Sequence, residues 1–260
     1  MKLIAAILLV LALAGCSPAN LTPAELDEIG AKPSDDARLP QDLNFVDDTA
    51  EDRNSSSLLG AGPIVMMFVD YDCGYLCETS FPMLEKGLAA LEGDGGDDVQ
   101  LVAIPLDARD GPELAHAFRM KHVSAVDGIK PPILLTGDRQ AIDRSTTALG
   151  YHYRFDAAHD RFAHDASAYV LRADGSVAGL VGPFALDGQA LERVITQARS
   201  PAHARAVDFA GGIAGLCYGL QAAAGALTPY VQSALPTLAI LLLCGGALAL
   251  VRMSRGRTRP

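Results

Sequence analysis

The chain has few basic residues and lacks the short motifs that identify several common enzyme classes. It contains 21 Lys and Arg against 31 Asp and Glu, a net charge of −10. This balance argues against nucleic acid or an anionic lipid surface as a partner, because both attract positive charge. The sequence has no Gly-x-Ser-x-Gly, no phosphate-binding loop and no His-Glu-x-x-His, which argues against the hydrolases and nucleotide enzymes that carry them. It also has no internal repeat or low-complexity tract. The candidate reactive and metal-binding residues are among its five cysteines and six histidines.

The N-terminus has the pattern of a bacterial lipoprotein signal, predicted over residues 1–15. One Lys is followed by an apolar stretch over residues 3–14, and Leu-Ala-Gly then precedes Cys16. This order predicts export, cleavage before Cys16 and lipidation of that residue. A plain signal peptide and an uncleaved anchor are the alternatives. Residues 16–42, rich in Pro, Asp, Glu and Ala, are predicted to be a tether from the lipidated Cys to the globular domain.

The C-terminal part contains a second candidate anchor. Residues 234–251 carry no charge and are just long enough to cross the hydrocarbon of a bilayer, so they predict a transmembrane helix. Four arginines follow in residues 252–260, which predicts a cytoplasmic tail and a globular domain on the extracytoplasmic, periplasmic side of the cytoplasmic membrane. A buried hairpin helix is the alternative. Residues 201–233 are predicted to be a weakly apolar connector.

The predicted globular domain, residues 43–200, begins with alternating strand and helix patterns. Apolar runs of strand length occupy residues 64–70, 99–105 and 133–136. Helices are predicted over residues 76–91, 113–122 and 138–149, the last stopped by Gly150. This alternation predicts an α/β fold with parallel strands, in which ligands bind beyond the carboxyl ends of the strands.

The remaining segments of the domain read mainly as strands. Residues 44–49 predict a short edge strand, and residues 166–171 and 177–181 flank a hairpin turn. Asp187 is predicted to cap a final helix that ends near Ala198.

Residues 151–156 alternate aromatic and polar side chains, which predicts a strand with one face inward. After a turn, His164 shares a face with Phe162 on the returning strand. We therefore expect His164 to point inward and His152, on the polar face of the first strand, to point outward.

Cys73 and Cys77 directly follow the first buried run. The Cys-x-x-x-Cys spacing at the start of a helix places two sulfurs one turn apart on one face. Unpaired backbone N–H groups and the positive end of the helix dipole favour thiolates there. Two such thiolates select Cu(I) or zinc. A structural disulfide and two buried thiols are the alternatives, and a thiol–disulfide exchange reaction would use the same pair.

His164 is the candidate for a third ligand, which would complete a site of two sulfurs and one nitrogen. The alternative is a hydrogen-bonded core histidine, because nothing in its spacing from the thiols requires it to converge on them. The sequence spacing alone leaves both interpretations open.

At these positions the chain resembles the SCO/SenC proteins. The matching segments are Val-Asp-Tyr-Asp-Cys-Gly-Tyr-Leu-Cys, residues 104–113, Leu-Thr-Gly-Asp at 135–138, and residues 153–164. The resemblance covers about residues 40–200 and implies a thioredoxin-like fold. It further implies that Cys73, Cys77 and His164 are copper ligands and that Asp107 is the acidic residue of the second loop. Asp72, next to Cys73, is a further candidate to support the ligands.

The resemblance also implies a function. SCO/SenC proteins bind copper and help assemble the copper site of cytochrome c oxidase, so we expect a membrane-anchored copper chaperone whose partner is the copper-site subunit of that oxidase. A thiol reductant or another copper carrier would be a further partner, and no nucleic acid is expected. The alternative is an extracytoplasmic thiol–disulfide reductase. His164 distinguishes the two, because exchange needs only an attacking and a resolving Cys.

Replacement of Cys16 by Ser is expected to abolish lipid attachment, because the acceptor thiol is lost. The variant should nevertheless stay with the membrane through residues 234–251. Incorporation of labelled fatty acid and membrane fractionation measure the two effects. Release of the variant into the soluble fraction would rule out the second anchor.

Overall fold

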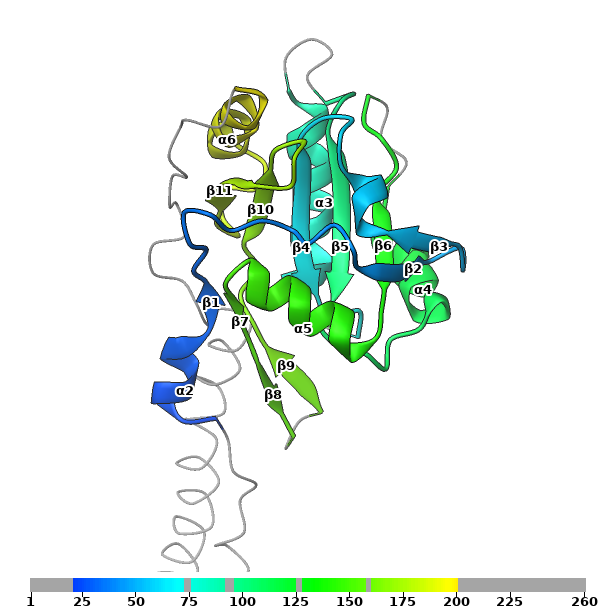
Figure 1. Ribbon diagram of the computed structural model, residues 1–260, viewed down its shortest axis with the longest axis vertical. Coiled ribbons are helices and arrows are strands. Elements are labelled where there is room, and N and C mark those ends of the chain that lie inside the picture. Colours follow the sequence, from blue (N-terminus) through cyan, green and yellow to red (C-terminus); the bar gives the residue numbers. More distant parts are fainter. Residues whose placement is uncertain (1–20, 73–75, 92–95, 125–127, 158–159, 201–260) are drawn as a thin grey trace, which may run out of the picture. The chain divides into compact units, whose positions relative to one another are not determined.

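The computed structural model describes residues 21–72, 76–91, 96–124, 128–157 and 160–200 (Figure 1). The expected lipoprotein signal, connector, membrane span and tail lie outside these residues. Within the described part, none of the helices combines the length and the apolar character that a membrane crossing requires.

The elements alternate as the sequence predicted for an α/β fold. The strands are β1 (Gly30–Ala31), β2 (Asn44–Asp47), β3 (Asp52–Asn54), β4 (Ile64–Val69), β5 (Gln100–Pro105), β6 (Ile133–Thr136), β7 (Tyr151–His152), β8 (Arg154–Asp156), β9 (Arg161–Ala163), β10 (Ala168–Leu171) and β11 (Val177–Val181). The helices are α2 (Pro23–Glu28), α3 (Leu76–Ala89), α4 (Pro112–His122), α5 (Arg139–Ala148) and α6 (Gln189–Arg199), with a 3-10 turn η1 at Ser55–Leu58.

A seven-stranded sheet forms the centre of the domain, in the order β11-β10-β4-β5-β6-β2-β3. β4, β5 and β6 are parallel neighbours, and the other strand pairs of this sheet are antiparallel. All six residues of β4 are buried, which fits the continuous apolar run that the sequence shows there.

The sheet separates two apolar cores. Val65, Met67 and Val69 of β4 pack with residues of α3, α4 and α6 on one face. Met66 and Phe68 pack on the other face with α5 and with the chain that precedes β2. In Figure 1, α3 accordingly lies behind the sheet and α5 in front of it. Successive side chains of a strand point to opposite faces, so one strand contributes to both cores.

The ends of α5 match the expectation from the sequence. The side chain of Asp138 caps the helix by accepting a hydrogen bond from the Ala141 N–H at 2.7 Å. Gly150 follows the helix with φ +62°, a conformation in which a β-carbon would also meet the Lys32 carbonyl. The same glycine accepts a hydrogen bond from the Lys32 N–H at 2.8 Å.

The second half of the expected tether is part of the domain. Thr22 and Glu25 form a capping box that starts α2. β1 pairs with β7, and Ile29 and Leu39 are buried in the core. The boundary expected at residue 43 is therefore too late. The sequence pattern does not reveal that this segment joins the core, because Ile29 and Leu39 are isolated apolar residues that follow neither strand nor helix spacing.

Three further expectations are corrected. The strand at residues 44–49 is not at the edge, because β2 lies between β6 and β3. The strand expected at 151–156 is divided into β7 and β8, which pair with β1 and β9, respectively. The final helix begins without a cap from Asp187: its N-cap is Gly188, which supplies no side chain.

Leu39→Ala is expected to lower the free energy of unfolding by about 2–5 kcal/mol, because a fully buried leucine leaves a cavity when truncated. Met120→Ala is the control, since Met120 on α4 is 73% exposed. Urea unfolding of the detergent-solubilised protein measures both changes. Equal stabilities of the two variants would contradict the packing of the N-terminal segment.

Candidate functional site

The carboxyl ends of β4 and β5 form the edge at which the thiol motif leaves the sheet. Parallel pairing aligns Val69 with Pro105, so the segments that follow the two strands start side by side. α3 begins at Leu76 and has Cys77 in its first turn, which confirms the helix start expected at this motif. Cys73 and the side chain of Cys77 lie outside the described residues, so the approach of the two sulfurs stays a prediction.

Three buried carboxylates follow these strands: Asp70 after β4, and Asp107 and Asp110 after β5. The backbone N–H of Arg109 donates to Asp107 Oδ1 at 2.8 Å, and its Nε donates to Oδ2 at 2.7 Å. Burial by itself would raise the pKa of Asp107. The hydrogen bonds and positive charge of Arg109 outweigh burial and hold this pKa below its usual range.

Asp110 has the opposite behaviour. Burial, together with the negative charges of Asp107 and Asp70, raises the pKa of Asp110 to about 7, although the Tyr71 N–H donates to its carboxyl group and opposes the shift. Its Oδ2 has no hydrogen-bond partner within the described part of the chain. Asp110 therefore binds a proton near neutral pH, while Asp107 stays ionised.

His164 follows β9 and is 2% exposed, so the imidazole lies inside the domain as expected. Its Nδ1 is 3.0 Å from the backbone oxygen of Asp165 and 3.2 Å from the Tyr151 hydroxyl oxygen. A carbonyl oxygen only accepts hydrogen bonds, so Nδ1 carries the proton in this arrangement. The lone pair is then on Nε2, which is the nitrogen able to bind a metal ion.

The β8–β9 hairpin contacts the loops after β4 and β5. The backbone N–H of Phe162 donates to Asp70 Oδ2 at 3.4 Å. Arg109 pairs with Asp160 in the hairpin turn at 3.0 Å, and its guanidinium carbon lies 5.5 Å from the ring centroid of Phe155. In Figure 1, the arrows of β4 and β5 point toward the end of the domain where β8 and β9 lie. The strand that leads to His164 is thus bonded to the turn that leads to Cys73.

The structure brings Asp107 and the strand before His164 to the same edge. Asp72 is exposed, and its N–H donates to Asp70 Oδ1 at 3.2 Å. Sequence reasoning missed Asp70 and Asp110, although an acidic residue just beyond a buried parallel strand was an available signal. No cluster of three or more His, Cys, Asp and Glu suited to a metal ion occurs among the described side chains, which do not include the two cysteines.

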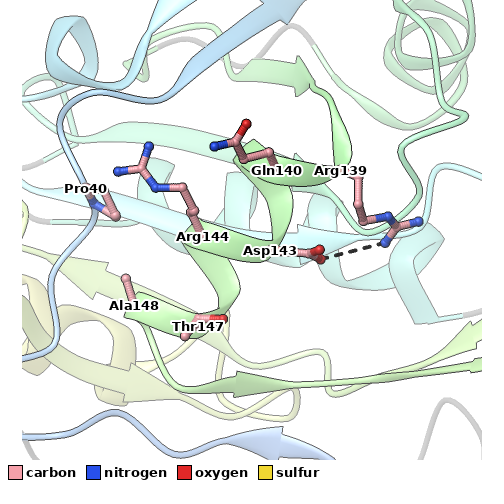
Figure 2. Close-up of a pocket in the computed structure, with 7 residues that line it drawn as sticks. All are labelled: Pro40, Arg139, Gln140, Asp143, Arg144, Thr147 and Ala148. Carbon is pink, nitrogen blue, oxygen red and sulfur yellow. Dashed lines mark ion pairs between the residues drawn. The ribbon is translucent and has the colours of Figure 1, made fainter.

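An open pocket of about 700 Å³ lies elsewhere, along α5 (Figure 2). It is lined by Pro40 and by residues of α5. Arg139 and Asp143 form an ion pair of 3.9 Å at one side of it. None of the residues that the sequence predicted for the site lines this pocket, so we do not assign it to the same function.

The parallel β-α-β unit, the β10–β11 hairpin and Cys77 in the first turn of α3 define a thioredoxin-like α/β protein. Within that class, the model of the SCO1/SenC family matches residues 31–199. The chain belongs to the SCO1/SenC family.

Solved structures of the family share this fold. Arabidopsis thaliana ScoI with copper bound is 16% identical, with a TM-score of 0.52 over 63% of this chain and 99% of that chain. A SCO1/SenC family lipoprotein from Bacillus anthracis is 19% identical, with a TM-score of 0.52 over 65% and 96%. BsSco, described as having a disulfide switch and as one of the Sco family of cytochrome c oxidase assembly proteins, is 18% identical, with a TM-score of 0.50 over 65% and 97%. A search of curated proteins gave no significant match.

Asp110→Asn is expected to change how stability depends on pH. The pKa of Asp110 is about 7 in the folded protein against 3.8 for an ordinary Asp, so its favourable contribution is complete below about pH 4 and is lost as the pH rises to 7. Asn stays neutral and still accepts the Tyr71 N–H. The variant should therefore gain stability relative to the unmodified protein between pH 5 and pH 8.

Urea unfolding of the reduced, copper-free protein at both pH values measures this gain. Asp52→Asn is the control, because it removes the same charge from an exposed position. Parallel pH profiles for Asp110→Asn and the unmodified protein would contradict the raised pKa.

Proposed function

We propose that this protein binds one copper ion through Cys73, Cys77 and His164 and delivers it to the copper-site subunit of cytochrome c oxidase. The observation that carries the proposal is the contact between Phe162 and Asp70. It bonds the strand before His164 to the turn before Cys73, a convergence that spacing in the sequence left open. Membership of a family that contains copper-bound ScoI and the oxidase assembly protein BsSco supports the identity of the metal and the partner.

The chemistry of the donor set fits copper. Two thiolates are soft ligands suited to Cu(I), and an imidazole adds the nitrogen that Cu(II) prefers. His164 is buried and carries its proton on Nδ1, so Nε2 would face the metal without a change of tautomer. Copper supplies no chemistry of its own in this proposal, because it is the cargo of the protein.

The surrounding acids would support the site through charge. Asp70, Asp107 and Asp110 lie within the same two loops, where Arg109 pairs with Asp107. A surplus of negative charge favours a bound cation. We assign Asp107 and Asp72 a supporting role, with Asp107 holding the loop through Arg109 rather than binding the metal.

The place of action in this proposal is the outer face of the cytoplasmic membrane. Lipidated Cys16 and residues 234–251 would hold the domain there, with the C-terminus in the cytoplasm. The lipoprotein relative from Bacillus anthracis supports the first anchor. A thiol reductant or another copper carrier would serve as a second partner, because copper binding requires both thiols to be reduced.

His164→Ala is expected to weaken Cu(I) binding about tenfold or more and to leave Cu(II) scarcely bound. Two thiolates still hold Cu(I) with two ligands, whereas Cu(II) favours nitrogen and more ligands. Cys73→Ser and Cys77→Ser should lose more affinity than His164→Ala. Competition with chelators measures the affinities, and oxidase activity in cells measures delivery.

His152→Ala is the matched control, because His152 is exposed and lies in β7, which pairs with β1. The thiol–disulfide reductase hypothesis expects a different order: either Cys substitution is damaging, but His164→Ala leaves exchange and oxidase assembly unchanged. If His164→Ala and His152→Ala both match the unmodified protein in both measurements, the copper-site assignment is wrong.

A further inference from the structure

Tyr151 is a buried tyrosine whose hydroxyl group lies beside the imidazole of His164. It is 3% exposed, and its oxygen is 3.2 Å from His164 Nδ1. The hydroxyl also donates a short hydrogen bond to the backbone oxygen of Asp165, which is the oxygen that lies 3.0 Å from Nδ1. Two polar groups, the Tyr151 hydroxyl and the Asp165 carbonyl, therefore meet at Nδ1 of the imidazole.

The direction of these hydrogen bonds determines which nitrogen carries the proton. The only hydroxyl hydrogen of Tyr151 points to the Asp165 oxygen, so the hydroxyl can receive but not give a hydrogen bond at Nδ1. The Nδ1–H group then has two acceptors, the Asp165 oxygen and the Tyr151 oxygen. The other tautomer would turn the Nδ1 lone pair toward the carbonyl oxygen, and the two would repel each other. The arrangement favours a proton on Nδ1 and a lone pair on Nε2.

The surroundings of Tyr151 keep its hydroxyl in place. Its ring centroid is 4.5 Å from that of Phe68 in β4 and 6.2 Å from that of Tyr169 in β10. On the other side, β7 pairs with β1, with Ala31 opposite Tyr151. The central sheet and the N-terminal segment thus hold the residue between them.

We propose that Tyr151 is a positioning residue for His164: its hydroxyl group holds the Asp165 carbonyl and orients the imidazole, and together with that carbonyl it keeps the proton on Nδ1, so that Nε2 is presented as the copper ligand. The proposal rests on the proposed function of His164. It also gives the N-terminal segment a part in shaping the site, because β1 pairs with β7, the strand that contains Tyr151.

Tyr151→Phe tests the proposal, because it keeps the ring and removes the hydroxyl. The full-length protein in detergent, with its thiols reduced, is titrated with Cu(I) and Cu(II) against chelators. We expect Cu(II) affinity to fall about tenfold, as is common when a hydrogen-bond partner of a ligating histidine is lost. The Cu(II) electron paramagnetic resonance spectrum should change as well, since the ligand field alters, while Cu(I) affinity falls less.

Tyr169→Phe is the matched control. Tyr169 is fully buried beside the same Phe68 ring, and its hydroxyl donates to the Leu149 carbonyl at 2.9 Å. Both substitutions remove one buried hydroxyl, so a general loss of stability would affect copper binding equally in the two variants. Equal losses, or no loss for Tyr151→Phe, would overturn the proposal.

His164→Ala in the same assay separates this inference from the function on which it rests. If His164→Ala loses Cu(II) while Tyr151→Phe binds normally, only the role of Tyr151 is wrong. If His164→Ala also binds normally, the copper-site assignment fails and the role of Tyr151 fails with it.

A second measurement needs neither copper nor a folded variant. Nitrogen-15 chemical shifts of His164 in the unmodified, reduced, copper-free protein report the tautomer at a pH where the ring is neutral. We expect a protonated Nδ1 and an unprotonated Nε2. The opposite pattern would overturn the proposal even if Tyr151→Phe failed to fold.

Discussion

Complete burial of β4 is the constraint on which the rest of the domain depends. Its backbone groups pair with β5 on one side and β10 on the other, and its side chains enter both cores. Because β4 is buried on both faces, its register is fixed: a shift by one residue would move each side chain from one core into the other. That register fixes where Asp70 and the thiol motif leave the sheet. It also aligns them with the segment that carries Asp107 and Asp110.

The candidate site combines three parts of the chain that are far apart in sequence. Two are the loops after β4 and β5, which parallel pairing brings together. The third is the β8–β9 hairpin, which Asp70 and Arg109 bond to those loops. Asp70, Asp107 and Asp110 are buried carboxylates in these loops. Arg109 holds the pKa of Asp107 below its usual range, whereas burial and the charges of Asp107 and Asp70 raise the pKa of Asp110.

The N-terminal segment links the proposed membrane anchor to the interior of the site. β1 pairs with β7, Tyr151 lies in β7, and the Tyr151 hydroxyl contacts His164. The residues between Cys16 and the domain are consequently fewer than the composition indicated. Their reach from a membrane would be correspondingly shorter, since residues from Ile29 onward belong to the folded unit.

The sequence by itself determined the α/β class, the strands β4, β5 and β6, the helices α3, α4 and α5, and the start of α3 at the thiol motif. Long apolar runs and helical spacing are local patterns, and they report local structure directly. Only the tertiary structure decided that residues 29–39 join the core, that the strand around Tyr153 is divided between two partners, and that the hairpin before His164 meets Asp70. Each of these depends on backbone hydrogen bonds or single buried side chains between distant segments, and such pairings leave no periodic pattern in either segment alone.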